Sequence, residues 1–200
     1  MCYNAEISLK TFIYGCISAI ILIILNNTLY SNILIVFSFT LMQLLEYFVW
    51  KNINNKKIIK NLSICGIFLI FFQLIILNYF TNIKYRFYLL SCLFFFFILY
   101  LIIIFPTTNL YMEKGKNGHL IWHWSIIPFI WYIIIFLFYL IPLYLSKRYF
   151  AFFYCLITIF ISLYFFYKYK TFGTMWCYIS NYLWILLIIK SIYNISSYLR

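Results

Sequence analysis

The chain has 200 residues, of which 67% are apolar and 9% are charged, and its formal net charge is +12. A soluble globular domain is roughly half apolar and about a quarter charged, so this composition excludes one and predicts an integral membrane protein. Because the cations stand in short connections between apolar runs, the positive charge indicates membrane anchoring, and no nucleic acid is expected as a partner.

Seven apolar runs are each long enough to cross a bilayer, which takes about 20 residues of α-helix. They predict an all-α integral membrane bundle of about seven transmembrane helices, with residues 1–200 forming a single domain. In chain order, the predicted spans are 9–26, 31–50, 59–79, 86–105, 120–144, 149–167 and 174–194. The lipid bilayer is then the principal partner of the protein.

The cations in the connections predict the orientation of the bundle, since cytoplasmic connections carry the excess of Lys and Arg. The side of the N-terminus holds nine cations: Lys10, Lys51, Lys56, Lys57, Lys60, Lys114, Lys116, Lys168 and Lys170. The opposite side holds six: Lys84, Arg86, Lys147, Arg148, Lys190 and Arg200. This difference predicts a cytoplasmic N-terminus and a C-terminus outside.

An odd number of spans also gathers the reactive side chains at one face of the membrane. Odd-numbered helices begin, and even-numbered helices end, on the side of the N-terminus. The polar side chains expected at this face are Cys2, Asn4, Glu6, Gln43, Glu46, Glu113, His119, His123, Trp176 and Cys177. The sequence therefore predicts a cluster of Glu, His and Cys at a single membrane interface.

Glu46 is the strongest candidate for a catalytic or proton-carrying residue. Phe39, Gln43, Glu46 and Trp50 follow steps of four, three and four residues, so they share one face of a helix. An ionisable group inside a span is costly and usually serves a function. The alternative is an interfacial carboxylate that reaches water beside Tyr47 and Trp50 or pairs with a lysine.

His119 and His123 are the candidate metal ligands. Their spacing of four residues would place both on one helix face, as in helical zinc sites. Together with Glu46 and either Cys177 or Cys2, they could complete a tetrahedral zinc site. In the alternative interpretation, both histidines are interface residues among neighbouring tryptophans, with their polar atoms reaching toward water.

Other polar positions have a packing interpretation. Glu6 and Lys10 stand in the stabilising order for an ion pair on a helix. Asn181 lies on one stripe of the last span between Cys177 and Trp184. A seam of small residues on the first span would allow a neighbouring helix to approach closely; its members are Ser8, Thr11, Gly15 and Ser18.

Three segments resemble a family of small, uncharacterised multi-pass membrane proteins. They are the opening "MCYNAEISL", the "LMQLLEYFVW" at the end of the second span, and the "GTMWCYISNYLWILL" of the last span. Members of this family open with Met-Cys-aromatic-Ser-Ala, carry Gln-x-x-Glu before a Trp, and have a late Trp-Cys. Here Asn4 replaces the usual Ser. The resemblance covers most of the chain and implies a multi-pass fold, but no activity.

A second resemblance concerns architecture alone. Seven spans with polar residues at one face are similar to the alkaline ceramidase and adiponectin receptor group, whose members are membrane-embedded zinc amidohydrolases. That resemblance implies zinc as a cofactor and a lipid amide as substrate. The group binds zinc through three histidines, whereas this chain has two histidines and no Asp, so a different set of ligands would be needed.

These observations leave three functions open. The first is a metal-dependent hydrolase of a lipid or lipid-linked amide, with Glu46 as general base. The second is a proton- or ion-coupled transporter of a small solute, with Glu46 titrating and Gln43, Ser180 and Asn181 as ligands. The third is a structural protein without catalytic role, in which the cluster is a network of hydrogen bonds between helices. The sequence specifies neither the substrate nor the oligomeric state.

Overall fold

The computed structural model of the chain describes residues 4–25, 30–80 and 83–198, and this part is an all-α bundle with seven crossings. Cys2, one of the predicted metal ligands, lies outside the described residues. In chain order, the helices are α1 (Ala5–Leu25), α2 (Tyr30–Lys51), α3 (Lys56–Tyr79), α4 (Ile83–Leu99), α5 (Phe129–Leu145), α6 (Tyr149–Phe166), α7 (Phe172–Ser180) and α8 (Leu183–Tyr198).

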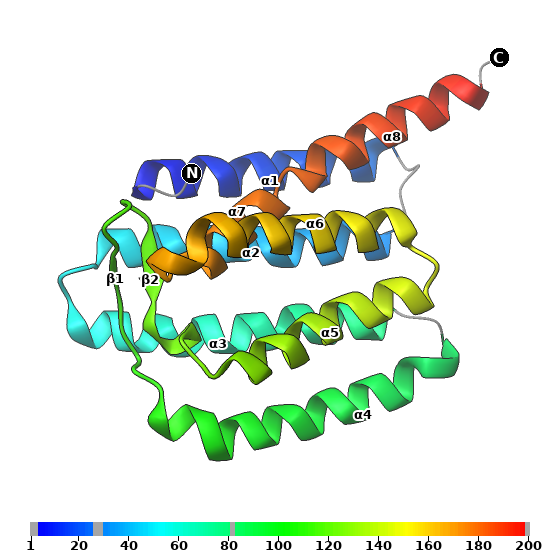
Figure 1. Cartoon of the computed structure of the whole chain (residues 1–200). Helices are drawn as coiled ribbons and strands as arrows, with labels where there is room; N and C mark the ends of the chain where they lie inside the picture. Colours follow the sequence, from blue (N-terminus) through cyan, green and yellow to red (C-terminus); the bar gives the residue numbers. More distant parts are fainter. Residues whose placement is uncertain (1–3, 26–29, 81–82, 199–200) are drawn as a thin grey trace.

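The lengths of the helices confirm a multi-pass membrane protein. Six segments of the described chain are long and apolar enough to span a membrane, and α7 and α8 together form one of them. The remaining crossing, α5, has 17 residues and is about 26 Å long, slightly shorter than the hydrocarbon core. Because the number of crossings is odd, the two ends of the chain lie at opposite ends of the bundle (Figure 1).

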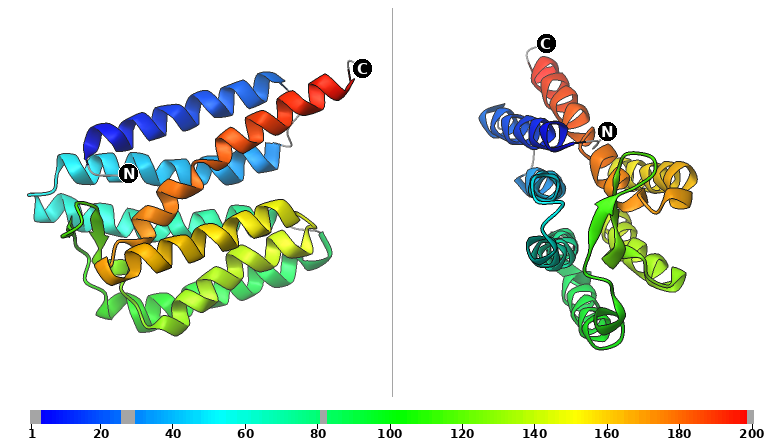
Figure 2. Two further views of the ribbon diagram at one scale, coloured as in Figure 1. Left: turned by 45° about the horizontal axis from the view of Figure 1, so that its top comes forward. Right: turned by 90° about the vertical axis from the view of Figure 1, so that its left-hand side faces the viewer.

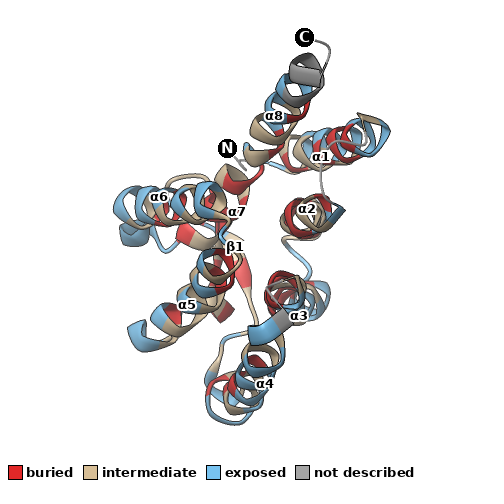
Figure 3. Cartoon of the chain, turned by 90° about the vertical axis from the view of Figure 1, so that its right-hand side faces the viewer, coloured by how far each residue is buried: buried red, intermediate tan, exposed pale blue. Residues whose placement is uncertain are grey.

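The helices form two layers. In Figure 3, α1, α2, α3 and α4 follow one another along one side, while α7, α6 and α5 form the other side. The contacts agree with this view, since each of the first four helices packs on the next, and α2 and α3 also contact α7 and α5. The buried residues face the space between the layers, where the hydrophobic core lies.

A β-hairpin caps one end of the bundle, where the sequence predicted the start of a helix. Strand β1 (Met112–Lys114) pairs antiparallel with β2 (Leu120–Trp122), with Met112 opposite Trp122. The hairpin crosses the end of the bundle between α3 and α6 (Figure 2, right). The predicted span 120–144 is therefore wrong over its first nine residues, and α5 begins at Phe129.

Local chemistry explains this difference. The turn of the hairpin closes when Gly115 N donates to His119 O at 2.7 Å, and Gly118 adopts φ 82°, a left-handed conformation that suits glycine. Pro128 disfavours helical geometry at Ile127, so a helix cannot run through this position from the strand. The segment between β2 and α5 instead contains a short 3₁₀ turn, η3 (His123–Ser125).

The last span is broken between α7 and α8, and the break is held by α2. Thr40 Oγ1 donates to Asn181 Oδ1 at 2.8 Å and accepts from Trp184 Nε1 at 2.9 Å. Asn181 Nδ2 donates to the Cys177 carbonyl at 2.8 Å. Thr40, Asn181 and Trp184 are all buried. Because lipid offers no hydrogen bonds, these polar groups must find their partners within the protein.

The small-residue seam predicted on the first span allows α1 to approach the same junction. Gly15 of α1 faces Thr40 so closely that a Cβ atom at this position would collide with the Thr40 side chain. Ser8 and Ser18 of the seam are also buried. Helix α1 therefore packs on α2 through its smallest residues, as the sequence predicted.

Replacing Thr40 with Val should destabilise the bundle, since Val keeps the shape but leaves Trp184 N–H and Asn181 Oδ1 without their partner. We expect a loss of about 1–3 kcal/mol of unfolding free energy. Thermal unfolding of the detergent-purified protein measures this loss. Thr11→Val is the matched control, because Thr11 donates only to the Ile7 carbonyl of its own helix. Equal stability of the two variants would contradict the proposed role of the junction.

Candidate functional site

The topology places all three acids and both histidines at the end of the bundle that carries the hairpin. This end contains the start of α1, the α2–α3 connection and the start of α7 (Figure 1). Lying at the same end of the bundle does not bring these residues together, however. Most of the predicted site residues instead make structural contacts with their own separate neighbours.

Glu46 lies inside the bundle rather than at its surface. Its side chain and that of Gln43 are fully buried on α2, so the carboxyl does not reach water as the alternative interpretation proposed. Phe39, on the same face, packs edge-on against Trp176 of α7 with ring centroids 5.8 Å apart. Cys177 of α7 is within electrostatic range of Glu46. The predicted face of α2 is therefore directed toward α7.

The histidines do not share a helix face, so the predicted helical pair is wrong. His119 belongs to the turn of the hairpin and is 2% exposed, with its ring edge-on to Phe166 at 5.7 Å. His123 opens the turn η3, and its Nε2 lies 2.9 Å from Glu113 Oε1. A spacing of four residues joins two ligands only in a helix, and this segment is a strand and a turn.

This arrangement does not fit the predicted zinc centre. Within residues 4–25, 30–80 and 83–198, no three His, Cys, Asp or Glu side chains are placed so that they could hold a metal ion. Cys177 is fully buried among the rings of the core, while His123 is already paired with Glu113. We therefore assign no chemical step to a metal.

The other predicted residues have structural roles. Asn4 precedes α1, and its Oδ1 accepts from Ile7 N at 2.9 Å, as in a helix N-cap. Glu6 and Lys10 form the expected ion pair at 2.6 Å, with both side chains largely exposed. Trp176 Nε1 donates to Thr158 Oγ1 of α6 at 3.2 Å. These contacts hold the helices together without forming a reactive centre.

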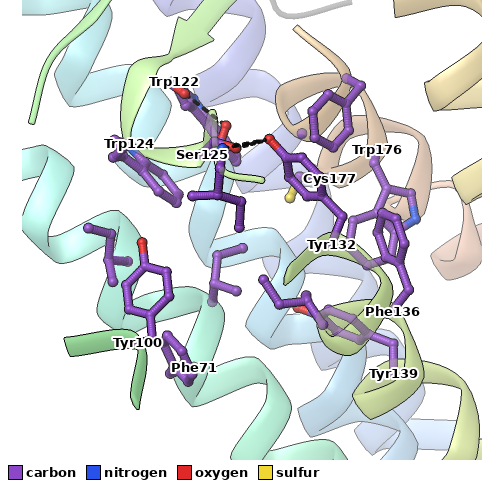
Figure 4. Close-up of a pocket in the computed structure, with 16 residues that line it drawn as sticks. Phe71, Tyr100, Trp122, Trp124, Ser125, Tyr132, Phe136, Tyr139, Trp176 and Cys177 are labelled. Atoms are coloured by element: carbon purple, nitrogen blue, oxygen red, sulfur yellow. Dashed lines mark hydrogen bonds between the residues drawn. The ribbon is translucent and has the colours of Figure 1, made fainter. Parts of the chain in front are cut away.

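The most distinctive feature at this end is an apolar cavity of about 70 Å³ beneath the hairpin. Figure 4 shows Trp124, Tyr100 and Phe71 on one side of it, with Tyr132, Phe136, Tyr139 and Trp176 on the other. Residues of α3, α5, α7 and η3 line it together with Tyr100, which begins a π-helical turn, η1 (Tyr100–Ile104), after α4. Sequence reasoning missed this cavity because its walls come from five separate segments.

Two stacked indoles form the roof of the cavity. The rings of Trp122 and Trp124 are nearly parallel, with centroids 5.1 Å apart. Glycines make room for both, since a Cβ at Gly66 would be 2.8 Å from Trp124 Cζ2, and one at Gly173 would be 3.2 Å from Trp122 Cε3. Both indoles are buried, and neither Nε1 has a hydrogen-bond partner among the described residues. A buried tryptophan N–H usually has a partner.

Three hydroxyl groups around the cavity are already paired. Tyr132 Oη donates to the Ser125 carbonyl, and Ser125 Oγ donates to the Trp122 carbonyl at 2.8 Å. Tyr139 Oη donates to Gln73 Oε1 at 2.8 Å. These bonds fix part of the walls. The two buried indole N–H groups have no acceptor among the described residues, and the hydroxyl of Tyr100, which also lines the cavity, takes part in none of these bonds.

No protein-family model, curated protein or solved structure matches the chain. Membership of the small multi-pass family therefore stays a prediction from the three sequence segments. The function of the cavity has to be inferred from its own residues.

The stability of the hairpin should depend on pH through His119. Burial lowers the pKa of this imidazole below its usual value of 6.5, because the folded protein disfavours the charged ring. The contribution of His119 to stability is therefore complete above about pH 6.5 and is lost as the pH falls through the lowered pKa. After correction for the intrinsic amide exchange rate, which is itself lower at lower pH, we expect lower hydrogen-exchange protection in peptides covering 112–124 at pH 5.5 than at pH 7.5.

His119→Phe provides the comparison, since it fills the same buried position without a titratable group. The hairpin of this variant should be less sensitive to acid than that of the wild type. An unchanged acid response in His119→Phe would show that His119 does not control the hairpin.

Proposed function

We propose that the protein binds a lipid that carries an ester or amide carbonyl, with part of its chain in the cavity beneath the hairpin. The observation that carries this proposal is an apolar cavity whose wall includes the stacked indoles of Trp122 and Trp124, with their N–H groups buried within that wall and without a partner among the described residues. A largely apolar pocket with a few polar groups is typical of small-molecule binding sites.

The size of the cavity limits what it can hold. An apolar cavity of about 150 Å³ stays dry and binds benzene, so one of about 70 Å³ suits a segment of an alkyl chain rather than a ring. Its lining is almost entirely carbon, which disfavours a hydrated ion. A membrane supplies alkyl chains in excess, and the cavity extends from beneath the hairpin to the middle of α3 and α5.

The indoles give the site a preference among lipids. A buried donor without a partner costs about 1–3 kcal/mol, and a carbonyl oxygen of the ligand would recover part of this cost. A plain hydrocarbon of the same length fills the cavity but leaves the donors unpaired. We therefore expect the carbonyl to strengthen binding by about tenfold.

Equilibrium binding of radiolabelled methyl oleate and of the matching C18 alkene tests the proposal on detergent-purified protein. The wild type should bind the ester about tenfold more tightly than the alkene, and Trp124→Phe should reduce this ratio toward one. A wild type that does not distinguish the two probes would overturn the proposal.

A second pair of variants tests whether the cavity itself holds the probe. Ile135→Phe adds volume to a cavity-lining position of α5 and should weaken binding of both probes. Ile133→Phe makes the same change at an exposed position of the same helix and should have no effect. Equal loss in both variants would place the probe outside the cavity.

Hydrolysis of the bound carbonyl goes beyond what these contacts support. Glu46 is a buried carboxyl close to Cys177, which lines the cavity, and it could act as a general base. Within the described residues, however, no three His, Cys, Asp or Glu side chains come together around it. The proposal is therefore confined to binding.

Proton-coupled transport is a second candidate, favoured by the full burial of Glu46 and by the break in the last span. Transporters often place substrate sites at interrupted helices, and buried carboxyls carry protons in such proteins. In this mechanism, α7 and α8 would move relative to α2 when the Glu46 carboxyl binds or releases a proton.

If the protein carries protons, Glu46→Gln should abolish acidification-driven proton flux into liposomes that contain a pH-sensitive dye. Glu6→Gln is the matched control, because Glu6 lies at the exposed start of α1 and pairs only with Lys10. Flux that persists in Glu46→Gln would rule out this mechanism, and methyl oleate binding should not differ between the two variants.

A further inference from the structure

A second pocket, of about 300 Å³, lies beside the cavity and is polar. It is formed where the segment after η1, the turn η3 and the segment before α7 meet, and His123 is the residue of the predicted polar cluster that it includes. Its lining includes Thr107, Asn109, His123 and Lys170, with Ile127 on its apolar side. Ile127 also lines the aromatic cavity, so the two spaces are neighbours.

The charges of the pocket favour an anion. Lys170 has no acidic partner in the described part of the chain, whereas the nearby Glu113 is paired with His123 at 2.9 Å. The same end of the bundle carries many more lysines than acids; they are Lys51, Lys56, Lys57, Lys60, Lys114, Lys116 and Lys168. Such an excess attracts the anionic lipids of the adjacent leaflet.

The hydrogen-bonding groups limit which side chains would contact the anion. The hydroxyls of Thr107 and Thr108 already donate to the carbonyls of Ile104 and Phe105, at 2.9 and 2.8 Å. They therefore do not donate to a ligand. The ammonium group of Lys170 and the side-chain amide of Asn109 remain as donors.

The backbone fixes the point from which the Lys170 side chain emerges. Lys170 ends a 3₁₀ turn, η4 (Tyr167–Tyr169), with φ 57°, and its N–H donates to the Tyr167 carbonyl at 2.9 Å. This left-handed conformation suits Gly or Asn better than lysine. Asn can therefore replace Lys170 while keeping the turn.

We infer that this pocket binds the phosphate group of an anionic lipid through Lys170. The chain of the same lipid would pass Ile127 and enter the aromatic cavity, a path that rests on the proposed function. Lysine binds phosphate as a point charge, and its neighbours supply apolar surface for the glycerol end of the lipid. The inference narrows the ligand from a carbonyl-bearing lipid to a phospholipid.

Native mass spectrometry of the detergent-purified chain tests the inference with dioctanoyl phosphatidic acid and dioctanoyl glycerol, which differ only in the phosphate. The wild type should bind the phosphatidic acid about fivefold or more tightly than the glyceride. Lys170→Asn should remove this preference and leave binding of the glyceride unchanged. A preference that survives in Lys170→Asn would overturn the inference.

Lys147 provides a closely matched control. It has φ 56° and lies after α5 at the opposite end of the bundle, so Lys147→Asn makes the same change of charge and backbone there. It should leave the preference intact, and an equal loss in both variants would indicate only the general attraction of a basic protein. Glu113→Gln removes the nearest acid and should increase affinity for phosphatidic acid.

Two further experiments distinguish a lipid site from a free-phosphate site, and this pocket from the cavity. Inorganic phosphate should displace phosphatidic acid only weakly if the acyl chains contribute; displacement at equal concentration would overturn a lipid site in favour of free phosphate. Ile135→Phe should weaken both lipids if the proposed function is correct. Loss of the phosphate preference alone in Lys170→Asn, with no effect of Ile135→Phe, would support this site and reject the cavity.

Discussion

The structure depends on one constraint, which is that lipid offers no hydrogen bonds to the chain. Every backbone group within the bilayer must find a partner inside the protein, so the spans are helices and non-helical backbone is confined to places with internal partners. The break at Asn181 obeys this rule through Thr40, which bonds to Asn181 and Trp184 at once. The hairpin obeys it through its own ladder at the end of the bundle.

The same constraint explains why the polar residues of the spans face inward. Gln73 accepts from Tyr139, and its Nε2 donates to the Ser38 carbonyl, so α3 is bonded to both α5 and α2. Asn78 similarly donates to the Phe138 carbonyl. These bonds fix the spacing of the two layers, and aliphatic side chains and aromatic rings together fill the space between them. A small apolar cavity, lined largely by rings, remains beneath the hairpin.

The cavity and the polar pocket are neighbouring spaces, with Ile127 in the lining of both. Trp122 and Trp124 belong to the roof of the apolar part, and His123 between them contributes to the polar part. The alternation of strand and turn geometry sends these neighbouring side chains to different sides. The stretch "WHW", which looks like an interfacial belt in the sequence, thus lies between the apolar cavity and the polar pocket.

The sequence by itself determined the features that depend on local composition. The length and hydropathy of the runs predicted the membrane class and the number of crossings, and from that number the common end of Glu46, His123 and Cys177. These predictions were possible because the free energy of transferring a segment into lipid is a sum over the residues of that segment. The predicted helix at His119 and His123 was wrong, since a glycine turn and Pro128 favour a hairpin there. The cavity, the junction at Thr40 and the pairing of His123 with Glu113 were decided only by the tertiary structure. The cavity and the Thr40 junction join side chains from segments far apart in the chain, and hydrophobic periodicity carries no information about which helices become neighbours. The pair of His123 and Glu113 depends on the register of the hairpin, which periodicity does not reveal either.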